Sequence, residues 1–324
     1  MKSTILLITI LFFTQTAFGQ EVLYDKFIRE ADSLYDAQDY KNAALTYSRA
    51  FEKLEWKGYQ SDRYNAACSW ALAGEADSAF FQLERIANKS TFSDLDHLTS
   101  DPDLNSLHSD DRWATLLEKV KFNKEKAEEN LDKPLAAQLD SIFESDQLYR
   151  IQIKEIEQKF GRESNEMKSH YRLMAETDSL NLIKVKSILD SRGWLGADIV
   201  GEKGNSCLFL VIQHADLSTQ EKYLPMMREA VKSGNAGASS LALLEDRVAL
   251  RQGKKQIYGS QIGWNKDTKL YFVSPLEDPD NVDKRRAEVG LQPLSEYVQQ
   301  WEIIWDCEQY KKDLPKLLEL EKKN

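Results

Sequence analysis

Cysteine is scarce in this sequence: the 324 residues include only three, Cys68, Cys207 and Cys307. An odd number allows at most one disulfide and leaves at least one thiol, which excludes a fold that depends on a disulfide scaffold. The core therefore has to come from side-chain packing. Each cysteine lies beside apolar or aromatic residues, which favours buried free thiols, although the count alone leaves a disulfide open.

Histidine is scarce as well, and the usual metal-binding patterns are missing. The chain has four histidines, no His-Glu-x-x-His motif and no closely paired cysteines, so we expect neither a metal site nor a cofactor. His97, His108 and His170 stand among polar residues and are interpreted as solvated. His214 differs from them because it lies at the end of a long apolar run.

Blocks of basic residues are also missing. Lys and Arg total 43 against 53 Asp and Glu, which gives a formal net charge of −10. An acidic chain without a basic block argues against binding to nucleic acid or to an anionic membrane surface through general electrostatics. We therefore expect partners of another kind.

No segment beyond the first twenty residues has the roughly 20 apolar residues that a membrane-spanning helix needs. The beginning of the chain has instead the three parts of a signal peptide: Lys2, the apolar run Ile5–Phe13, and small residues in Ala17–Gly19 before a cleavage site. We predict a signal peptide over residues 1–19 and an exported protein, periplasmic or secreted, without an integral membrane segment after cleavage. An uncleaved membrane anchor is the alternative.

Residues 22–122 show internal repetition that predicts paired helices. Ala31 and Ala43 return as Ala67 and Ala79, 36 residues later, among apolar residues at helical spacing. The other residues of the pattern are Phe27, Leu34, Tyr47, Ala50, Trp70, Leu83 and Ile86. The region resembles tetratricopeptide repeats, although neither copy ends in the usual proline. The resemblance implies a platform for a protein or peptide partner, and ordinary helical hairpins are the alternative.

A second domain is predicted over residues 132–310, after a charged and apolar-poor run at 121–130. Apolar residues at helical spacing predict a helix from about Leu135 and another over about 165–191. The short apolar run Leu208–His214 is also expected to be helical, because helices flank it.

Strands are expected in one place only. Gln256–Gln261 and Leu270–Val273 have the composition of two short strands, joined by a turn around Asn265–Asp267. The sequence therefore predicts a mostly α-helical protein with N-terminal helical hairpins and a C-terminal helical domain that contains one small β-hairpin.

Short polar clusters follow one another along the second domain in a characteristic order. They are Asp146-Gln147, Arg150, Gly193–Gly196, Gln213–Asp216, Gln220, Asp246–Val248, Gln256–Gln261, Asp283, Arg285-Arg286 and Gly290–Leu294. In these clusters the chain resembles, over about residues 132–305, a bacterial family catalogued as domain of unknown function 6624. The resemblance implies a mostly helical domain, and it implies neither an activity nor a substrate.

Arg247 is a candidate ligand-binding residue in apolar surroundings. On a helical wheel drawn from Leu241, Arg247 falls inside the apolar arc and Asp246 falls at its edge. An arginine in that position needs an acidic partner or an anionic ligand. One interpretation is a structural ion pair with Asp216, Asp246 or Asp283. The other is a guanidinium fork that binds a carboxylate or a phosphate.

His214 is the candidate catalytic residue, because an imidazole can act as a general acid or base near neutral pH. Asp216 is not expected to orient it, since residues two apart point away from each other on a helix. A partner from another segment, such as Asp246, would be needed. A hydrogen-bonded core histidine without a catalytic role is the alternative.

Further polar side chains are candidates for the same site. Gln256 and Tyr258 would share one face of the predicted strand, and Gly259 could bring Gln261 round to that face. These groups suit a polar ligand such as a peptide or a sugar, and they equally suit hydrogen bonds inside the domain. The predicted ligand-binding residues are Gln213, Asp216, Gln220, Asp246, Arg247, Gln256, Tyr258, Gln261 and Arg286.

Three functions follow from these observations as alternatives. The preferred one is an exported binding or scaffold protein of the cell envelope, with helical repeats for a protein or peptide partner and a C-terminal polar pocket. The second is a hydrolase that acts on an envelope peptide or glycan, with His214 as general acid or base. No Ser or Cys stands in a recognised nucleophile setting, which weakens the hydrolase. The third is a polar cluster that is purely structural.

Overall fold

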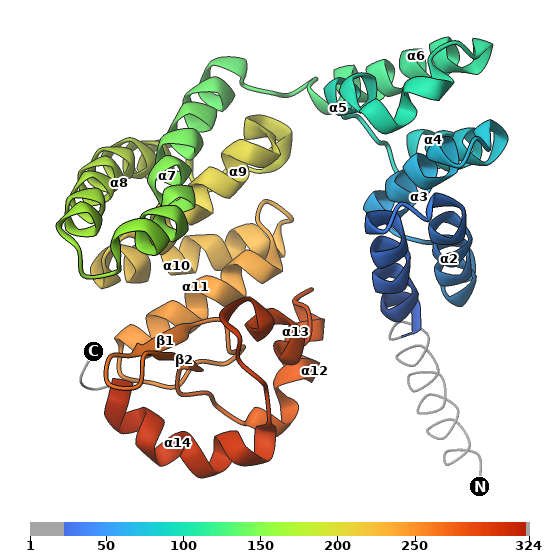
Figure 1. Cartoon of the computed structure of the whole chain (residues 1–324). Coiled ribbons are helices and arrows are strands. Elements are labelled where there is room, and N and C mark those ends of the chain that lie inside the picture. Colours follow the sequence, from blue (N-terminus) through green and yellow to red (C-terminus); the bar gives the residue numbers. More distant parts are fainter. Residues whose placement is uncertain (1–22, 322–324) are drawn as a thin grey trace, which may run out of the picture. The chain divides into compact units, whose positions relative to one another are not determined.

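The computed structural model describes residues 23–321. The chain divides into two compact units, Met1–Glu129 and Asn130–Asn324, each with its own hydrophobic core (Figure 1). The predicted signal peptide, residues 1–19, lies outside the described residues. Within the described range, no helix combines the length and the apolar character that crossing a membrane requires.

The first unit consists of consecutive helical hairpins (Figure 1). A helix over residues 23–36 comes first. The elements that follow are α2 Tyr40–Lys53, α3 Gln60–Leu72, α4 Ala76–Lys89, α5 Leu95–Ser100, the 3-10 helix η1 Pro102–Leu107, and α6 Asp111–Ala127. Helix α3 packs against both α2 and α4, and α4 also contacts α6. The core of the unit therefore lies along a row of helices that are neighbours in sequence.

Small residues allow the helices of the first unit to approach each other closely. Ala31, Ala43, Ala67 and Ala79 are all completely buried. Large side chains fill the space beside them, and the ring of Phe51 is buried in the same cluster as Ala31. The positions at which the sequence repeats are thus the positions at which the helices meet.

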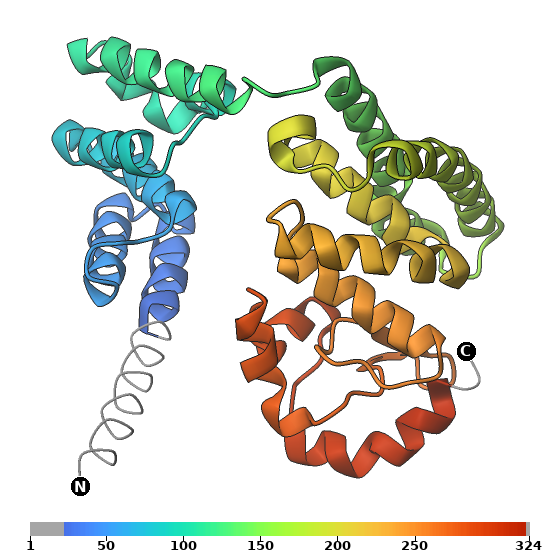
Figure 2. The ribbon, with the colours of Figure 1, turned by 180° about the vertical axis from the view of Figure 1, so that it is seen from behind.

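Five helices form the larger part of the second unit, and Figure 2 shows them from behind. They are α7 Lys133–Phe160, α8 Asn165–Arg192, α9 Ala197–His214, α10 Leu217–Lys232 and α11 Ala238–Arg251. The two 28-residue helices α7 and α8 form a long hairpin, and α9 packs against both. The run Leu208–His214 forms the last turns of α9, so its predicted helical structure is confirmed.

The chain then forms a two-stranded antiparallel sheet and several shorter helices. The strands are β1 Ile262–Asn265 and β2 Leu270–Val273, and Ile262 pairs with Val273. The remaining elements are η2 Pro279–Asn281, α12 Val282–Glu288, α13 Leu294–Tyr297, η3 Val298–Trp301 and α14 Cys307–Glu321. The prediction of a mostly α-helical protein with one small hairpin is confirmed.

The position predicted for the first strand is wrong. Residues 256–261 form a loop, and the hairpin begins only with β1. The backbone N–H groups of Ile257, Tyr258 and Ser260 donate to the side chain of Asp246 and not to a neighbouring strand. A buried carboxylate therefore takes the hydrogen bonds that a strand would have used.

Gly58, in the connection between α2 and α3, offers a test of the packing in the first unit. Its φ is +41°, and a Cβ atom there would overlap the buried ring of Phe51. Gly58→Ala should cost about 1 kcal/mol for the backbone and a further ~1–3 kcal/mol for the displaced ring. Thermal unfolding followed by circular dichroism measures the loss.

Gly74 provides the matched control for this substitution. Its φ is +77°, but a Cβ atom placed on it would meet no other atom within 4 Å. Gly74→Ala should therefore show the backbone cost alone. Equal losses of stability in the two variants would contradict the packing argument.

Candidate functional site

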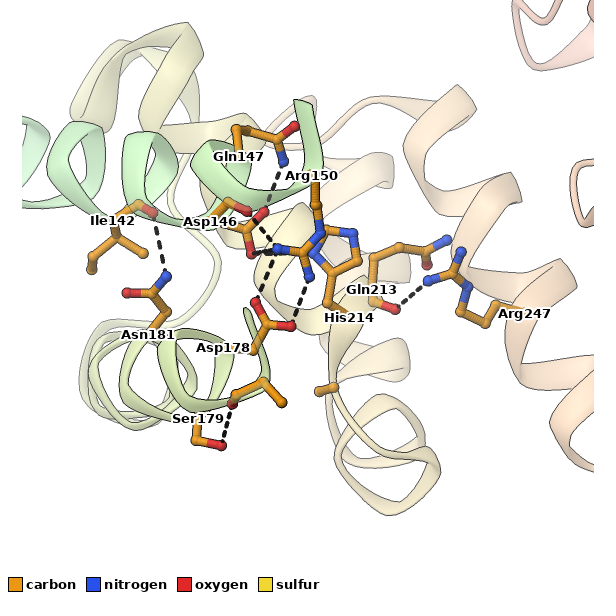
Figure 3. A network of polar contacts seen from close by, with 12 residues as sticks. Ile142, Asp146, Gln147, Arg150, Asp178, Ser179, Asn181, Gln213, His214 and Arg247 are labelled. Atoms are coloured by element: carbon orange, nitrogen blue, oxygen red, sulfur yellow. Dashed lines mark hydrogen bonds and ion pairs between the residues drawn. The ribbon is translucent and has the colours of Figure 1, made fainter. Parts of the chain in front are cut away.

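The last residue of α9, His214, faces a buried carboxylate on α7 (Figure 3). Its Nδ1 lies 3.1 Å from Oδ1 of Asp146, whose side chain is 2% exposed. Gln147 Nε2 donates to the other carboxylate oxygen at 2.7 Å. The tautomer of His214 that donates from Nδ1 holds the ring in one orientation and leaves Nε2 as an acceptor. Such a pair is chemically suited to general acid–base work.

Arg150 connects this pair to α8 (Figure 3). Its Nη1 lies 3.4 Å from Oδ1 of Asp146, and its two terminal nitrogens donate to Asp178 at 2.9 and 2.8 Å. Burial raises the pKa of Asp146, but the hydrogen bond and charge of His214, together with the charge of Arg150, outweigh burial and hold that pKa below its ordinary value. The partner of His214 is therefore Asp146, and the prediction of Asp246 in that role is wrong.

Asp246 has a different role. It is completely buried on α11 and accepts backbone N–H groups from Ile257 at 2.6 Å, Tyr258 at 2.9 Å and Ser260 at 2.9 Å. Burial raises the pKa of Asp246, and the three N–H donors act in the opposite direction. The carboxylate anchors the loop between α11 and β1, so it is not available to orient His214.

Arg247 follows Asp246 on α11 and lies largely among uncharged groups. Its Nε donates to Oε1 of Gln261 at 2.9 Å, and its Nη1 donates to the main-chain oxygen of Gln213 at 2.8 Å. Among the described residues, no carboxylate lies within ion-pair distance of its guanidinium. Burial lowers the pKa of Arg247 to about 10, and the charge of Arg251 acts in the same direction.

The predicted ion pair of Arg247 is therefore wrong for all three of its candidate partners. Asp246 binds the loop described above. Asp216 accepts a backbone N–H in the first turn of α10 at 2.8 Å, and Asp283 accepts the N–H at the beginning of α13 at 2.7 Å. Each of these carboxylates is satisfied by backbone donors, which leaves the guanidinium with oxygen acceptors that carry no full charge.

Arg247 and Gln261 border a cleft of about 660 Å³ in the second unit. Residues from the turn between α7 and α8, from α11 and from the β-hairpin form its walls. The charged residues that line it are Arg162, Glu163, Arg247, Arg251, Lys266 and Glu321. Four of these six are basic, so the cleft carries a net positive charge in a chain whose formal charge is −10.

Two further arginines line the cleft, and each contacts neighbouring groups of the second unit. Arg251 Nη1 donates to the main-chain oxygen of Ala215 at 2.6 Å, and within residues 23–321 it has no carboxylate at ion-pair distance. Arg162 lies over the ring of Trp264 at 4.4 Å and is 3.8 Å from a carboxylate oxygen of Glu157. The guanidinium groups are thus positioned by uncharged neighbours to a large extent.

The glutamines predicted as ligands mostly form hydrogen bonds inside the domain. Gln256 is completely buried, and its Nε2 donates to Ser274 O at 2.7 Å. Gln220 is also buried, and its Nε2 donates to Gln213 O at 2.8 Å. The Nε2 of Gln213 donates to Leu243 O at 3.3 Å. These amides fix the ends of α9 and of the hairpin.

Arg286 is also an internal residue. It is completely buried, donates to the main-chain oxygen of Tyr258 at 2.7 Å and to that of Gln292 at 2.6 Å, and lies 4.8 Å from the centre of the Tyr297 ring. Of the ten predicted site residues, only Arg247 and Gln261 line the cleft. The eight that do not are Gln213, His214, Asp216, Gln220, Asp246, Gln256, Tyr258 and Arg286.

Several residues of the site were not among the predicted site residues, although Asp146 and Arg150 belong to the polar clusters that carry the family resemblance. Asp146 and Arg150 carried a detectable signal, since an acidic and a basic residue four apart share one face of a helix. Arg162 and Trp264 carried none, because they are 102 positions apart and meet only in the folded unit. Within residues 130–321, no three carboxylate, imidazole or thiol groups lie close enough together to hold a metal ion.

Comparison with protein families identifies most of the second unit. The model of a family described as "Family of unknown function (DUF6624)" matches residues 133–308. The match includes Asp146, His214, Arg247 and most of the cleft, and it excludes the first unit. No curated protein and no solved structure matches the chain.

Asp146→Asn tests the link between the buried carboxylate and the stability of the second unit. The substitution removes the charged partner of His214 and leaves Arg150 with Asp178 alone, and losing one member of a buried pair costs about 3–5 kcal/mol. Because the pKa of Asp146 is lowered on folding, its ionised carboxylate stabilises the fold at pH values above its pKa in the unfolded chain, which is about 3.9. This stabilisation is lost as the pH falls through the pKa of Asp146 in the folded chain. The unmodified chain should therefore lose more stability on acidification than Asp146→Asn.

Urea unfolding of both proteins from about pH 7 to about pH 3 measures this difference. Asp267→Asn, in the exposed turn of the β-hairpin, is the control and should keep the pH dependence of the unmodified chain. Parallel curves for Asp146→Asn and the unmodified chain would show that Asp146 does not contribute in this way.

Proposed function

The chain belongs to the family of unknown function DUF6624, and we propose that it is an exported binding protein of the cell envelope whose C-terminal unit binds an anionic ligand. In this proposal the helical hairpins of the first unit are tetratricopeptide-like repeats and bind a protein or peptide partner. The repeated spacing of the buried alanines supports the assignment of tetratricopeptide-like repeats to the first unit. The signal-peptide pattern in residues 1–19 supports export.

One observation carries the proposal for the C-terminal unit: the guanidinium of Arg247 borders a cleft and has no carboxylate partner among the described residues. Removing a charge from water is costly unless a hydrogen-bonded counter-charge compensates for it. The two oxygen acceptors of Arg247 satisfy two of its five N–H groups. An anion in the cleft would supply the missing charge and accept further hydrogen bonds.

The lining of the cleft indicates the class of ligand. The planar fork of a guanidinium matches the two oxygens of a carboxylate or of a phosphate. Arg251 adds a second guanidinium without a carboxylate partner in the described structure, and Lys266 adds an exposed ammonium group. Trp264 and Tyr171 contribute aromatic surface. A volume of about 660 Å³ suits a small molecule or a chain end that carries one such anionic group.

Arg247→Gln is expected to weaken anion binding because it removes the charge and the fork. The loss of a charge-assisted hydrogen bond costs about 1.5–3 kcal/mol, which corresponds to a ~10- to 150-fold increase in Kd. Isothermal titration with inorganic phosphate and with succinate measures the effect. Arg247→Lys should also bind weakly, since an ammonium group cannot reproduce the bidentate geometry.

Arg172→Gln is the matched control, because Arg172 is exposed on α8, is paired with Glu176 and does not line the cleft. Arg251→Gln is a second test at a more exposed position. It tests anion binding even if the Arg247 variants do not fold. Circular dichroism checks the fold of every variant. Equal affinities in Arg247→Gln, Arg251→Gln and Arg172→Gln would contradict the proposal, as would an unmodified chain that binds neither anion.

A hydrolase that acts on an envelope peptide or glycan is the second candidate. It is favoured by the contact of 3.1 Å between His214 and the buried Asp146, which is the arrangement of an oriented general base. His214 does not line the cleft, and its side chain is 18% exposed. This candidate therefore needs a substrate that reaches the ring from outside the cleft.

His214→Asn and Asp146→Asn test the hydrolase. If His214 acts as a base that Asp146 orients, both variants should lose at least ~100-fold in rate, since general acid–base catalysis contributes about 10²- to 10⁴-fold. The measurement is mass spectrometry of fragments released from purified peptidoglycan, which contains both peptide and glycan bonds. Release of no fragments by the unmodified chain, or unchanged release by His214→Asn, would exclude this candidate.

A further inference from the structure

The first unit contains a cavity of about 340 Å³ with an unusual set of side chains. Cys68 comes from α3, His97 from α5, and Asp101 and Asp103 from the beginning of η1. Cys68 is 3% exposed and Asp101 is 9% exposed. Sulfur, imidazole and carboxylate donors thus converge at one place, although they come from three helical elements.

One separation among these donors matches a tetrahedral metal ion, and the third donor lies nearby. One ligand atom each from Cys68, Asp101 and Asp103 lie within 4.8 Å of one another, and the Sγ–Oδ2 distance between Cys68 and Asp101 is 3.6 Å. A tetrahedral zinc ion with ~2.3 Å to sulfur and ~2.1 Å to oxygen holds those two atoms about 3.6 Å apart. An ion could therefore replace the thiol proton between these two atoms at their present separation.

His97 is placed to supply a fourth ligand. Its Nε2 lies 3.8 Å from Oδ2 of Asp101, one turn further along the chain. The ring stacks on Tyr64 with 4.9 Å between ring centres. The side chain of His97 is 55% exposed and already lines the cavity. The stacking restricts its orientation, which lowers the entropy that coordination would cost.

Outer hydrogen bonds already hold the carboxylates in place. The hydroxyl group of Tyr64 donates to Oδ2 of Asp101 at 2.9 Å, and that of Tyr35 donates to Asp103. Oδ1 of Asp101 accepts the backbone N–H of Asp103 at 3.0 Å. Groups of this kind, which bind the ligands but not the ion, orient the ligands of metal sites and raise their affinity.

The charge of the cavity also favours a cation. Asp32 and Asp36 line it in addition to Asp101 and Asp103, while the described lining residues include no lysine or arginine. Four carboxylates in one cavity repel one another unless a positive ion is near. We propose that Cys68, His97, Asp101 and Asp103 form a binding site for a divalent transition-metal ion of the zinc class. Coordination releases the Cys68 thiol proton to water, and the site is independent of the anion-binding cleft.

Metal titration of the purified protein tests this site. After treatment with a chelator under reducing conditions, the chain should bind one Zn²⁺ ion, measured by calorimetry and by metal analysis. Co²⁺ should give the near-ultraviolet charge-transfer band of a cobalt–thiolate bond. Cys68→Ser should abolish that band, and His97→Asn and Asp103→Asn should each raise the Kd for Zn²⁺ at least ~10-fold.

Cys307→Ser is the matched control. The thiol of Cys307 also lies 3.6 Å from an aspartate, Asp280, but it belongs to no group of three ligands in the described structure. This variant should keep both the Zn²⁺ affinity and the cobalt band. Circular dichroism checks the folding of each variant. If Cys68→Ser does not fold, His97→Asn still tests the site, because His97 is exposed and its substitution should leave the fold intact.

Three results would overturn the proposal. The first is an unmodified chain that binds no Zn²⁺ saturably. The second is a cobalt band that survives in Cys68→Ser and is lost in Cys307→Ser. The third is binding of a lysine-rich peptide in place of Zn²⁺. The peptide would then raise the melting temperature of the unmodified chain but not that of Asp103→Asn, and Zn²⁺ would raise neither. The acidic groups would in that case bind an ammonium group and not a metal.

Discussion

The buried carboxylate of Asp246 determines the course of the chain between α11 and the β-hairpin. A carboxylate without exposure to water is tolerable only if hydrogen bonds compensate for the lost solvation, and three N–H groups of the following loop do so. Arg286 also holds this loop, because its Nη1 donates to the carbonyl of Tyr258. The loop is thereby kept from pairing as a strand, and Gln261 is brought to a fixed place at its end.

The position of Arg247 depends on that loop. Gln261 accepts from its Nε, and the end of α9 accepts from its Nη1 through the carbonyl of Gln213. Two neighbouring residues of α11 therefore have different roles: Asp246 orders the backbone of the loop between α11 and β1, and Arg247 faces the cleft. A guanidinium held in this way loses little further conformational entropy when an anion binds, which is the physical advantage of a preformed site.

Charges are compensated unevenly within the second unit. Asp146, His214 and Arg150 satisfy one another with Asp178, so this network closes on itself. The arginines around the cleft have largely uncharged acceptors. The first unit shows the reverse imbalance, since its cavity gathers carboxylates without basic residues among the described lining. Each unit thus leaves one sign of charge incompletely compensated by its own side chains.

The sequence by itself determined the long helices, because helical periodicity is local: the helix expected over about 165–191 is α8, Asn165–Arg192. The helix over Leu208–His214 was expected from the helices that flank it, and it forms the end of α9. The sequence also indicated that Arg247 lies among apolar residues. Only the tertiary structure decided that Asp146 pairs with His214, 68 positions away, and that Asp246 binds a loop and not a side chain. Hydrogen-bond partners from distant segments leave no period in a sequence, since their meeting depends on how whole helices pack.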